Sequence, residues 1–319
     1  KKRLPKNPRI FIKPNWVYDK PSRNKDNFDS MVTHKSIVLS MVSILDELQP
    51  KEIIIGDSPV QECVFENIVD DEYREAIKKI TSAEVKIVNL SRYLLSTDRE
   101  IKYGKAQNQD GSSYLLFDLK DKSYLEPISS RINRFQIPNC DNELLRAHHR
   151  KGRHEYLIYK AIFDAALIIN LPKLKTHRKA GYTAAIKNFV GCVGDKVYLP
   201  HHRMGGTVLG GDSYPGLHPL RLFRELCLNQ RDHHIPNIQK FDKWNYYAQF
   251  FSRVDRWITR VFYQNRYIFE GAWSGNDTVW RTALDIFKII ECGDKQGQIQ
   301  EKPQREIWSL VDAIVCGEG

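Results

Sequence analysis

Cysteine is sparse in this chain and never falls in the spacings that hold metal clusters. Six cysteines are scattered over 319 residues without a C-x-x-C pair. This argues against a zinc ribbon or an iron–sulfur cluster held by this chain alone and is typical of reduced thiols. No apolar run approaches the roughly 20 residues of a membrane span, and the first residues lack a signal-peptide pattern. We therefore expect a cytoplasmic protein without a transmembrane segment.

Familiar catalytic and nucleic-acid-binding signatures are also missing. The sequence has no G-x-S-x-G elbow, H-E-x-x-H helix or kinase signature, and its glycines fit neither a P-loop nor a dinucleotide-binding fingerprint. Basic residues outnumber acidic ones, 49 to 39, but they are spread out and match no RNP, zinc-finger or helix-turn-helix pattern. An anionic small molecule or an acidic protein surface therefore explains the charge better than nucleic acid does.

Strand-like and helix-like segments alternate along the chain. Apolar runs predict strands over residues 9–12, 52–55, 85–89 and 164–170, and amphipathic periodicity predicts helices over residues 34–48 and 71–80. Thr33 is the expected N-cap of the first helix. The alternation indicates an α/β fold with a mainly parallel sheet flanked by helices.

Weaker patterns interrupt this alternation. We expect an α/β core over residues 1–93 and 147–234, with an irregular or β-rich insertion over 94–146 and a helical excursion over 235–272. Within the excursion, aromatic residues recur at helical spacing over 244–263, which favours a helix packed on the core or on a partner over peripheral membrane contact. Residues 273–319 return to the core. Because the chain starts at Lys1 and stops directly after a strand-like segment, we expect incomplete ends and a truncated C-terminus.

Polar residues follow three of the expected strands. Lys13 and Asn15 follow the first, Asp57 and Ser58 the second, and Lys173, Lys175 and His177 the strand over 164–170. Parallel strands point their carboxyl ends at one edge of the sheet, where α/β proteins bind ligands, so these side chains should meet in a crevice. Lysine suits phosphate or carboxylate, and a partly desolvated lysine acts as a base or nucleophile.

A later segment is rich in histidine and glycine. His201, His202 and Arg203 precede two glycine pairs. We expect a flexible loop folded over the site, in which His202 and Arg203 bind an anionic substrate.

Five short motifs occur in an order that resembles a known family. They are Ile12–Trp16, Thr33–Lys35, Ile54–Pro59, Asn170–His177 and Thr183–Gly191. Over most of the chain they resemble the uncharacterised prokaryotic domain of unknown function family 362. Some members of that family carry ferredoxin-like iron–sulfur modules, whose closely spaced cysteines this chain lacks. We include Asn188, which lies inside the last motif, among the expected substrate-binding residues.

The segment from His177 to Lys187 is also similar to the site segment of the lactate racemase family. In those nickel-pincer enzymes a histidine precedes, by a similar spacing, the lysine bonded to the cofactor. The resemblance implies that His177 binds nickel or another divalent metal and that Lys187 anchors a cofactor or substrate. This chain departs from that family in having Ala184-Ala185 in place of a glycine pair. It also has Asp57 and Ser58 where a second metal-binding histidine would lie.

These features predict an enzyme that acts on an anionic, phosphorylated or carboxylated small molecule, with redox or racemase-like chemistry as the narrower expectation. Lys13 and Lys173 would orient the anion, and Lys175, His177 and Lys187 would be the catalytic residues. The alternative is a non-catalytic module that uses the same crevice to bind an anion or an acidic partner.

Overall fold

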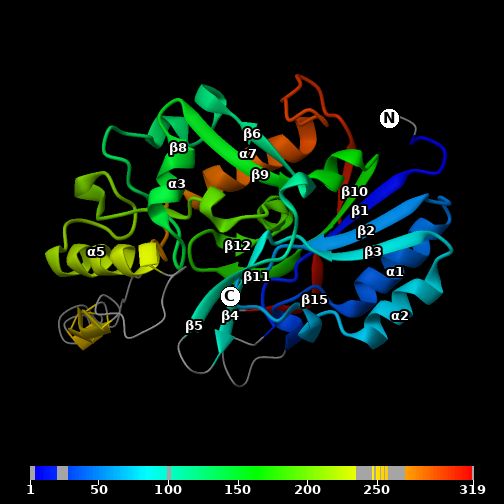
Figure 1. Ribbon diagram of the computed structural model, residues 1–319, viewed down its shortest axis with the longest axis horizontal. Helices are drawn as coiled ribbons and strands as arrows, with labels where there is room; N and C mark the ends of the chain where they lie inside the picture. The colour runs from blue at the N-terminus through cyan, green and yellow to red at the C-terminus, as the bar shows by residue number, and fades with distance from the viewer. Residues whose placement is uncertain are drawn as a thin grey trace.

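A five-stranded sheet forms the centre of the protein (Figure 1). The computed structural model describes residues 4–19, 28–98, 102–234 and 270–317, and a few separate residues between 246 and 257. The strands lie in the order β14, β10, β1, β2, β3, and all neighbours are parallel. Their bounds are β1 (Arg9–Pro14), β2 (Glu52–Asp57), β3 (Glu84–Asn89), β10 (Leu167–Leu171) and β14 (Glu306–Ser309). The predicted α/β fold with a mainly parallel sheet is confirmed.

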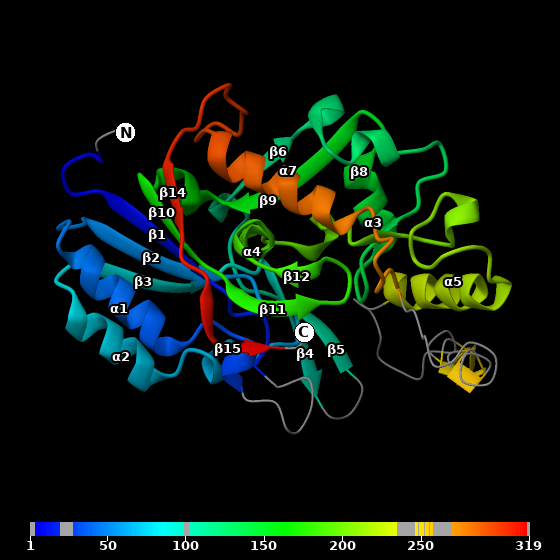
Figure 2. The same cartoon turned by 180° about the vertical axis from the view of Figure 1, so that it is seen from behind.

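Alternate residues of the central strands fill two hydrophobic cores, one on each face of the sheet. Ile10 and Ile12 belong to the core that includes residues of α1 (Lys35–Asp46) and α2 (Asp71–Ile80). Phe11 belongs to the other core, with residues of α7 (Val279–Cys292) and of the antiparallel pair β6 (Tyr114–Asp118) and β9 (Arg153–Tyr159). Figures 1 and 2 show these layers on either side of the sheet. A strand buried on both faces is apolar throughout, which is why the sequence reveals β1, β2 and β10.

Smaller elements surround this core. A three-stranded sheet of β12 (Gly181–Thr183), β11 (Lys173–His177) and β15 (Asp312–Gly317) continues from the carboxyl end of β10. The remaining helices and strands are β4 (Tyr93–Asp98), β5 (Lys102–Gln107), β7 (Phe135–Gln136), α3 (Asn142–His148), β8 (His149–Arg150), α4 (Ala185–Asn188), β13 (His202–Arg203) and α5 (Pro219–His234).

The start of α1 differs from the sequence prediction. His34, rather than Thr33, caps the helix, because its Nδ1 accepts a hydrogen bond from Ser36 N. The Thr33 hydroxyl accepts from Asn15 N at 2.7 Å and donates to Leu171 O at 2.7 Å. Thr33 therefore ties together the loops that follow β1 and β10.

Other segments differ as well. The Thr183–Gly191 motif contains the single turn α4 and most of a 3-10 turn over Phe189–Cys192, and the helix α5 was not predicted. The aromatic helix expected over 244–263 falls mostly outside the described residues. Within the described part of the chain, no helix has the length and apolar character needed to cross a membrane.

Candidate functional site

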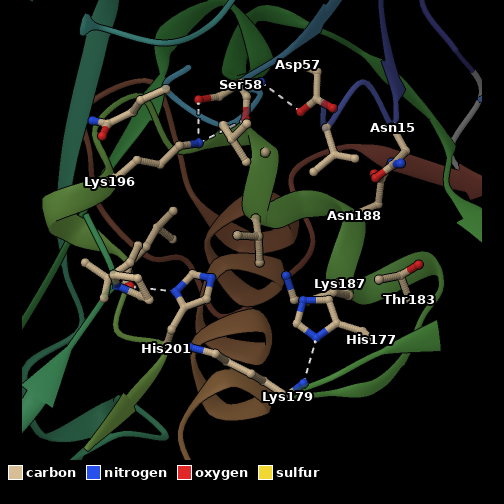
Figure 3. Close-up of a pocket in the computed structure, with 18 of the residues that line it drawn as sticks. Asn15, Asp57, Ser58, His177, Lys179, Thr183, Lys187, Asn188, Lys196 and His201 are labelled. Atoms are coloured by element: carbon tan, nitrogen blue, oxygen red, sulfur yellow. Dashed lines mark hydrogen bonds between the residues drawn. The ribbon is translucent and has the colours of Figure 1, made fainter. Parts of the chain in front are cut away.

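A cavity of about 380 Å³ opens where β1, β2 and β10 end and β11 begins (Figure 3). Eight of the eleven site residues predicted from the sequence line it: Asn15, Asp57, Ser58, Lys173, Lys175, His177, Lys187 and Asn188. The convergence of strand ends thus brings together residues up to 173 positions apart in the chain.

Lys13 and Asp57 form a buried ion pair beside this cavity. Lys13 Nζ lies 2.6 Å from Asp57 Oδ1, and the side chains are 0% and 4% exposed. Asp57 Oδ2 also accepts a hydrogen bond from Trp16 N at 2.6 Å. The backbone at Gly191 passes so close that an added Cβ would lie 1.9 Å from Asp57 Oδ1. The pair therefore fixes the loops after β1 and β2, and neither charge is free to bind a ligand alone.

Lys173 is neutralised in the same way. Its Nζ donates to Asp312 Oδ2 at 2.8 Å, with both side chains fully buried. Asp312 also accepts from His34 N at 2.8 Å, and the ion pair and hydrogen bond hold the pKa of its carboxyl below the usual range despite burial. The geometry therefore favours a structural role for Lys13 and Lys173 in place of the predicted contact with an anion.

Four other lysines line the cavity: Lys175, Lys179, Lys187 and Lys196. In the described part of the chain, no salt bridge within 4.0 Å involves any of them. Lys175 Nζ donates to Met31 O at 3.0 Å, and Lys196 Nζ donates to Ser58 O and Oγ, both at 2.9 Å. Lys187 Nζ has no hydrogen-bond partner among the residues the structure describes.

Burial and mutual repulsion disfavour the charged forms of these lysines. Burial lowers the pKa of Lys175 to about 8. Burial, reinforced by Lys175, Lys196 and Lys179, lowers the pKa of Lys187 to about 8. Burial also lowers the pKa of Lys196. An anion in the cavity would relieve this repulsion.

His177 is held as a neutral imidazole by the turn that follows β11. Its Nδ1 accepts hydrogen bonds from Lys179 N at 3.1 Å and Ala180 N at 3.0 Å. Since both partners are backbone donors, Nδ1 carries the lone pair and the proton of the neutral ring is on Nε2. Burial, followed by the charges of Lys187, Lys179 and Lys175, lowers the pKa of His177 to about 3.

His201 is held in the opposite tautomer. Its Nδ1 lies 2.8 Å from Leu199 O, and because a carbonyl only accepts, Nδ1 carries the proton and Nε2 the lone pair. Burial, with the charges of Lys187 and Lys179, holds the pKa of His201 well below its usual value. Figure 3 shows both rings in the cavity, with Lys187 beside His177.

His202 and Arg203 do not line this cavity. His202 is buried on the far side of Lys179, whose Nζ lies 3.5 Å from His202 Nδ1. Arg203 Nε lies 3.6 Å from Asp212 Oδ2. Of His201, His202 and Arg203, only His201 therefore lines the cavity.

Amide side chains hold α4 against the ends of the strands. Asn188 Nδ2 donates to Lys13 O at 3.0 Å and to Asn170 Oδ1 at 2.8 Å. Asn170 Nδ2 in turn donates to Ala185 O at 2.8 Å and Ser309 Oγ at 3.0 Å. Because α4 carries Lys187, this network positions that lysine in the cavity.

The geometry does not fit a metal bound by His177. A metal-binding histidine usually donates its second ring N–H to an acceptor, whereas both backbone partners of His177 Nδ1 are donors. Among the described residues, no group of three histidine, cysteine, aspartate or glutamate side chains is placed to hold a metal ion. Lys187 fits the anchoring role that the lactate racemase resemblance implies, since no described residue bonds to its Nζ, but that resemblance stays a prediction.

Three basic residues that line the cavity were not predicted as part of the site. They are Lys179, Lys196 and His201. Lys179 lies two residues after the predicted His177, and His201 was part of the histidine-rich segment, but neither pattern shows which side chain points inward. Nothing in the sequence near Lys196 marks it.

Comparisons with known proteins identify a family but no activity. A model of the family described as "Domain of unknown function (DUF362)" matches residues 131–308, more than half of the chain, and confirms the family resemblance. Comparison with curated proteins gives no match. A Thermotoga maritima protein, whose crystal structure comes from the Northeast Structural Genomics Consortium, aligns with 91% of this chain at 11% identity and a TM-score of 0.33. The alignment spans 55% of that protein's chain, and so low a TM-score supports no conclusion about function.

Proposed function

Because the chain belongs to the DUF362 family, whose description assigns no reaction, we propose a function from the site itself: an enzyme that acts on an anionic, phosphorylated or carboxylated small molecule. This proposal rests on one observation: Lys175, Lys187 and Lys196 line one cavity, and none of them pairs with a carboxylate among the described residues. A volume of about 380 Å³ is within the range of small-molecule sites.

The electrostatics favour an anion with more than one negative charge. Like charges within a cavity of low dielectric repel strongly, and a multiply charged ligand offsets several of these repulsions at once. Among the described residues no arginine lines the cavity. Lysine is a compact point charge on a flexible stem, so this wall suits a phosphate or a pair of carboxylates without demanding bidentate geometry.

Lys187 also has the properties of a catalytic base or nucleophile. Its pKa of about 8 leaves a fraction of the amine unprotonated near neutral pH. Its position on α4, fixed through Asn188 and Asn170, places it among the side chains that line the cavity (Figure 3). Lys175 and Lys196 would hold the anion while Lys187 reacts.

Calorimetry with defined anions tests the proposal. We expect sulfate, phosphate, pyrophosphate and citrate to bind at pH 7, with the multiply charged anions binding most tightly. Lys187→Met and Lys196→Met should each weaken citrate binding by roughly 10- to 100-fold, because each removes a charged hydrogen bond.

The matched control is Lys51→Met, which removes an exposed lysine directly before β2, at the end of the sheet opposite the cavity. This variant should bind like the wild type. Failure of all four anions to bind, or equal binding by the Lys187→Met and Lys51→Met variants, would contradict the proposal. Anion binding unaccompanied by any turnover would favour the non-catalytic module instead.

A further inference from the structure

The two histidines of the cavity present opposite hydrogen-bonding groups to a ligand. His177 offers Nε2–H, because its Nδ1 accepts from two backbone amides. His201 offers the lone pair of Nε2, because its Nδ1 donates to Leu199 O. The described residues supply no partner to either Nε2 atom. A ligand would therefore place a hydrogen-bond acceptor against His177 and a donor against His201.

The backbone contacts of His177 exclude proton transfer by the neutral ring. Release of the Nε2 proton would leave an imidazolate, and protonation of Nδ1 would turn two amide hydrogen bonds into repulsive contacts. The remaining role for such a ring is to donate a fixed hydrogen bond to a carbonyl oxygen that gains negative charge during a reaction.

Lys187 is the cation that lowers the pKa of His177 most. Of the charged groups acting on the His177 ring, Lys187 has the largest influence, followed by Lys179 and Lys175. Figure 3 shows the Lys187 nitrogen beside the ring. If a ligand carbonyl accepted a hydrogen bond from His177, the carbon next to that carbonyl would thus lie near the Lys187 amine.

We propose that the site enolises an anionic hydroxycarbonyl compound. The neutral His177 donates a hydrogen bond to the carbonyl oxygen, and His201 accepts a hydrogen bond from the hydroxyl group. Lys187 is the base. This assignment rests on the proposed function and names the substrate class and reaction of that same site.

The reaction balances without any redox partner. The unprotonated Lys187 amine removes a proton from the carbon beside the carbonyl, so a C–H bond breaks and an N–H bond forms. The electron pair forms a C=C bond and the carbonyl oxygen becomes an enolate oxygen, which the His177 N–H stabilises. The resulting ammonium of Lys187 then returns a proton to the same carbon, which restores the C–H bond, the carbonyl group and the neutral amine.

Nitrogen-15 NMR of histidine-labelled protein tests the tautomers directly. We expect His177 to remain the neutral Nε2–H form and His201 the neutral Nδ1–H form from pH 8 to pH 5. The groups that face these rings are Lys175, Lys179 and Lys187, and their positive charges oppose protonation. Titration of His177 within this range, or a proton on its Nδ1, would overturn the assignment.

Two substitutions at His177 separate structure from chemistry. Asparagine places an acceptor where Nδ1 stands, so His177→Asn keeps the turn but loses the Nε2 donor. Glutamine places an amide N–H near the Nε2 position, so His177→Gln keeps the donor but loses the turn contacts. If the donor acts in catalysis, His177→Asn should lose roughly 100- to 1,000-fold in kcat with little change in KM, whereas His177→Gln should retain more activity.

Deuterium exchange from D2O supplies the activity to be measured. The probes are hydroxypyruvate and dihydroxyacetone phosphate, which carry the hydroxyl that His201 would bind, and pyruvate and 2-oxoglutarate, which lack it. We expect exchange with a hydroxylated probe, abolished in Lys187→Met and unchanged in Lys51→Met. Absence of exchange from all four probes, or full exchange in Lys187→Met, would refute the enolisation. Citrate binding measured on the same samples distinguishes this failure from failure of the proposed function, because the anion site can be intact when the reaction assignment is wrong.

Discussion

Replacing Lys187 by methionine should stabilise the ligand-free protein. The Lys187 ammonium is surrounded by Lys175, Lys179 and Lys196, and its pKa falls from 10.5 to about 8. A shift of that size corresponds to an upper limit of about 3 kcal/mol at pH 7. Since the side chain is only half-buried and salt screens the repulsion, we expect a gain of about 1 to 2 kcal/mol in the free energy of unfolding.

The pH dependence of this gain identifies its cause. A lysine whose folded-state pKa is lowered bears the full penalty below about pH 8, where it is charged in both states. The penalty disappears as the pH rises towards 10.5, because the amine is then neutral in both states. Methionine does not titrate. The stability difference between Lys187→Met and the wild type should therefore be large at pH 7 and small near pH 10.

Urea denaturation at the two pH values measures this difference, with Lys51→Met as the control that should match the wild type at both. The double variant with Lys175→Met should gain less than the sum of the two single gains, because each substitution relieves the repulsion felt by the other lysine. Destabilisation by Lys187→Met at pH 7, or a gain independent of pH, would refute the electrostatic reasoning.

Three further predictions concern the same edge of the sheet. Sulfate binding at pH 8 should take up as much as about one proton per protein, since the two cavity lysines with a pKa of about 8 are then half protonated; calorimetry in buffers of different ionisation enthalpy measures this uptake, which should vanish at pH 6. Lys173→Met should destabilise the protein by roughly 3 to 5 kcal/mol in urea denaturation, because it leaves Asp312 buried and unpaired. Gly191→Ala should lower the melting temperature and weaken citrate binding, because its Cβ would collide with Asp57 and displace Lys13; an unaltered variant would show that the backbone there moves freely.

The sequence predicted the position of the site better than the ion pairs and hydrogen bonds within it. Apolar strands and the polar residues after them are local patterns, and the parallel sheet follows from their alternation. These patterns suffice to bring Asn15, Asp57 and Lys175 to one cavity. The partners of the ion pairs are not local, since Asp312 lies 139 residues from Lys173 and Asp57 lies 44 residues from Lys13. No periodicity in the sequence reveals such a pairing.

The sequence did not reveal the histidine tautomers either. The proton of the neutral His177 ring is on Nε2 because two amides of the following turn point at its Nδ1, and the direction of those amides depends on the backbone after β11. His201 and His202 are adjacent in the chain, but His201 lines the cavity and His202 does not, because alternate side chains of the extended backbone entering β13 point to opposite sides. The sequence showed an HHR segment without showing which histidine faces the ligand.

The contrast between the two sets of lysines at this edge is the strongest argument that the cavity binds an anion. Lys13 and Lys173 are completely buried, and each has a carboxylate within 2.8 Å. Lys175 lies two residues after Lys173 on β11 and Lys187 lies on α4, and no carboxylate pairs with them in the described part of the chain. A fold that supplies partners to two buried lysines and leaves their neighbours unpaired loses stability at those neighbours. The proposed anionic ligand would recover that stability on binding, so the same charges that weaken the empty site would provide its affinity.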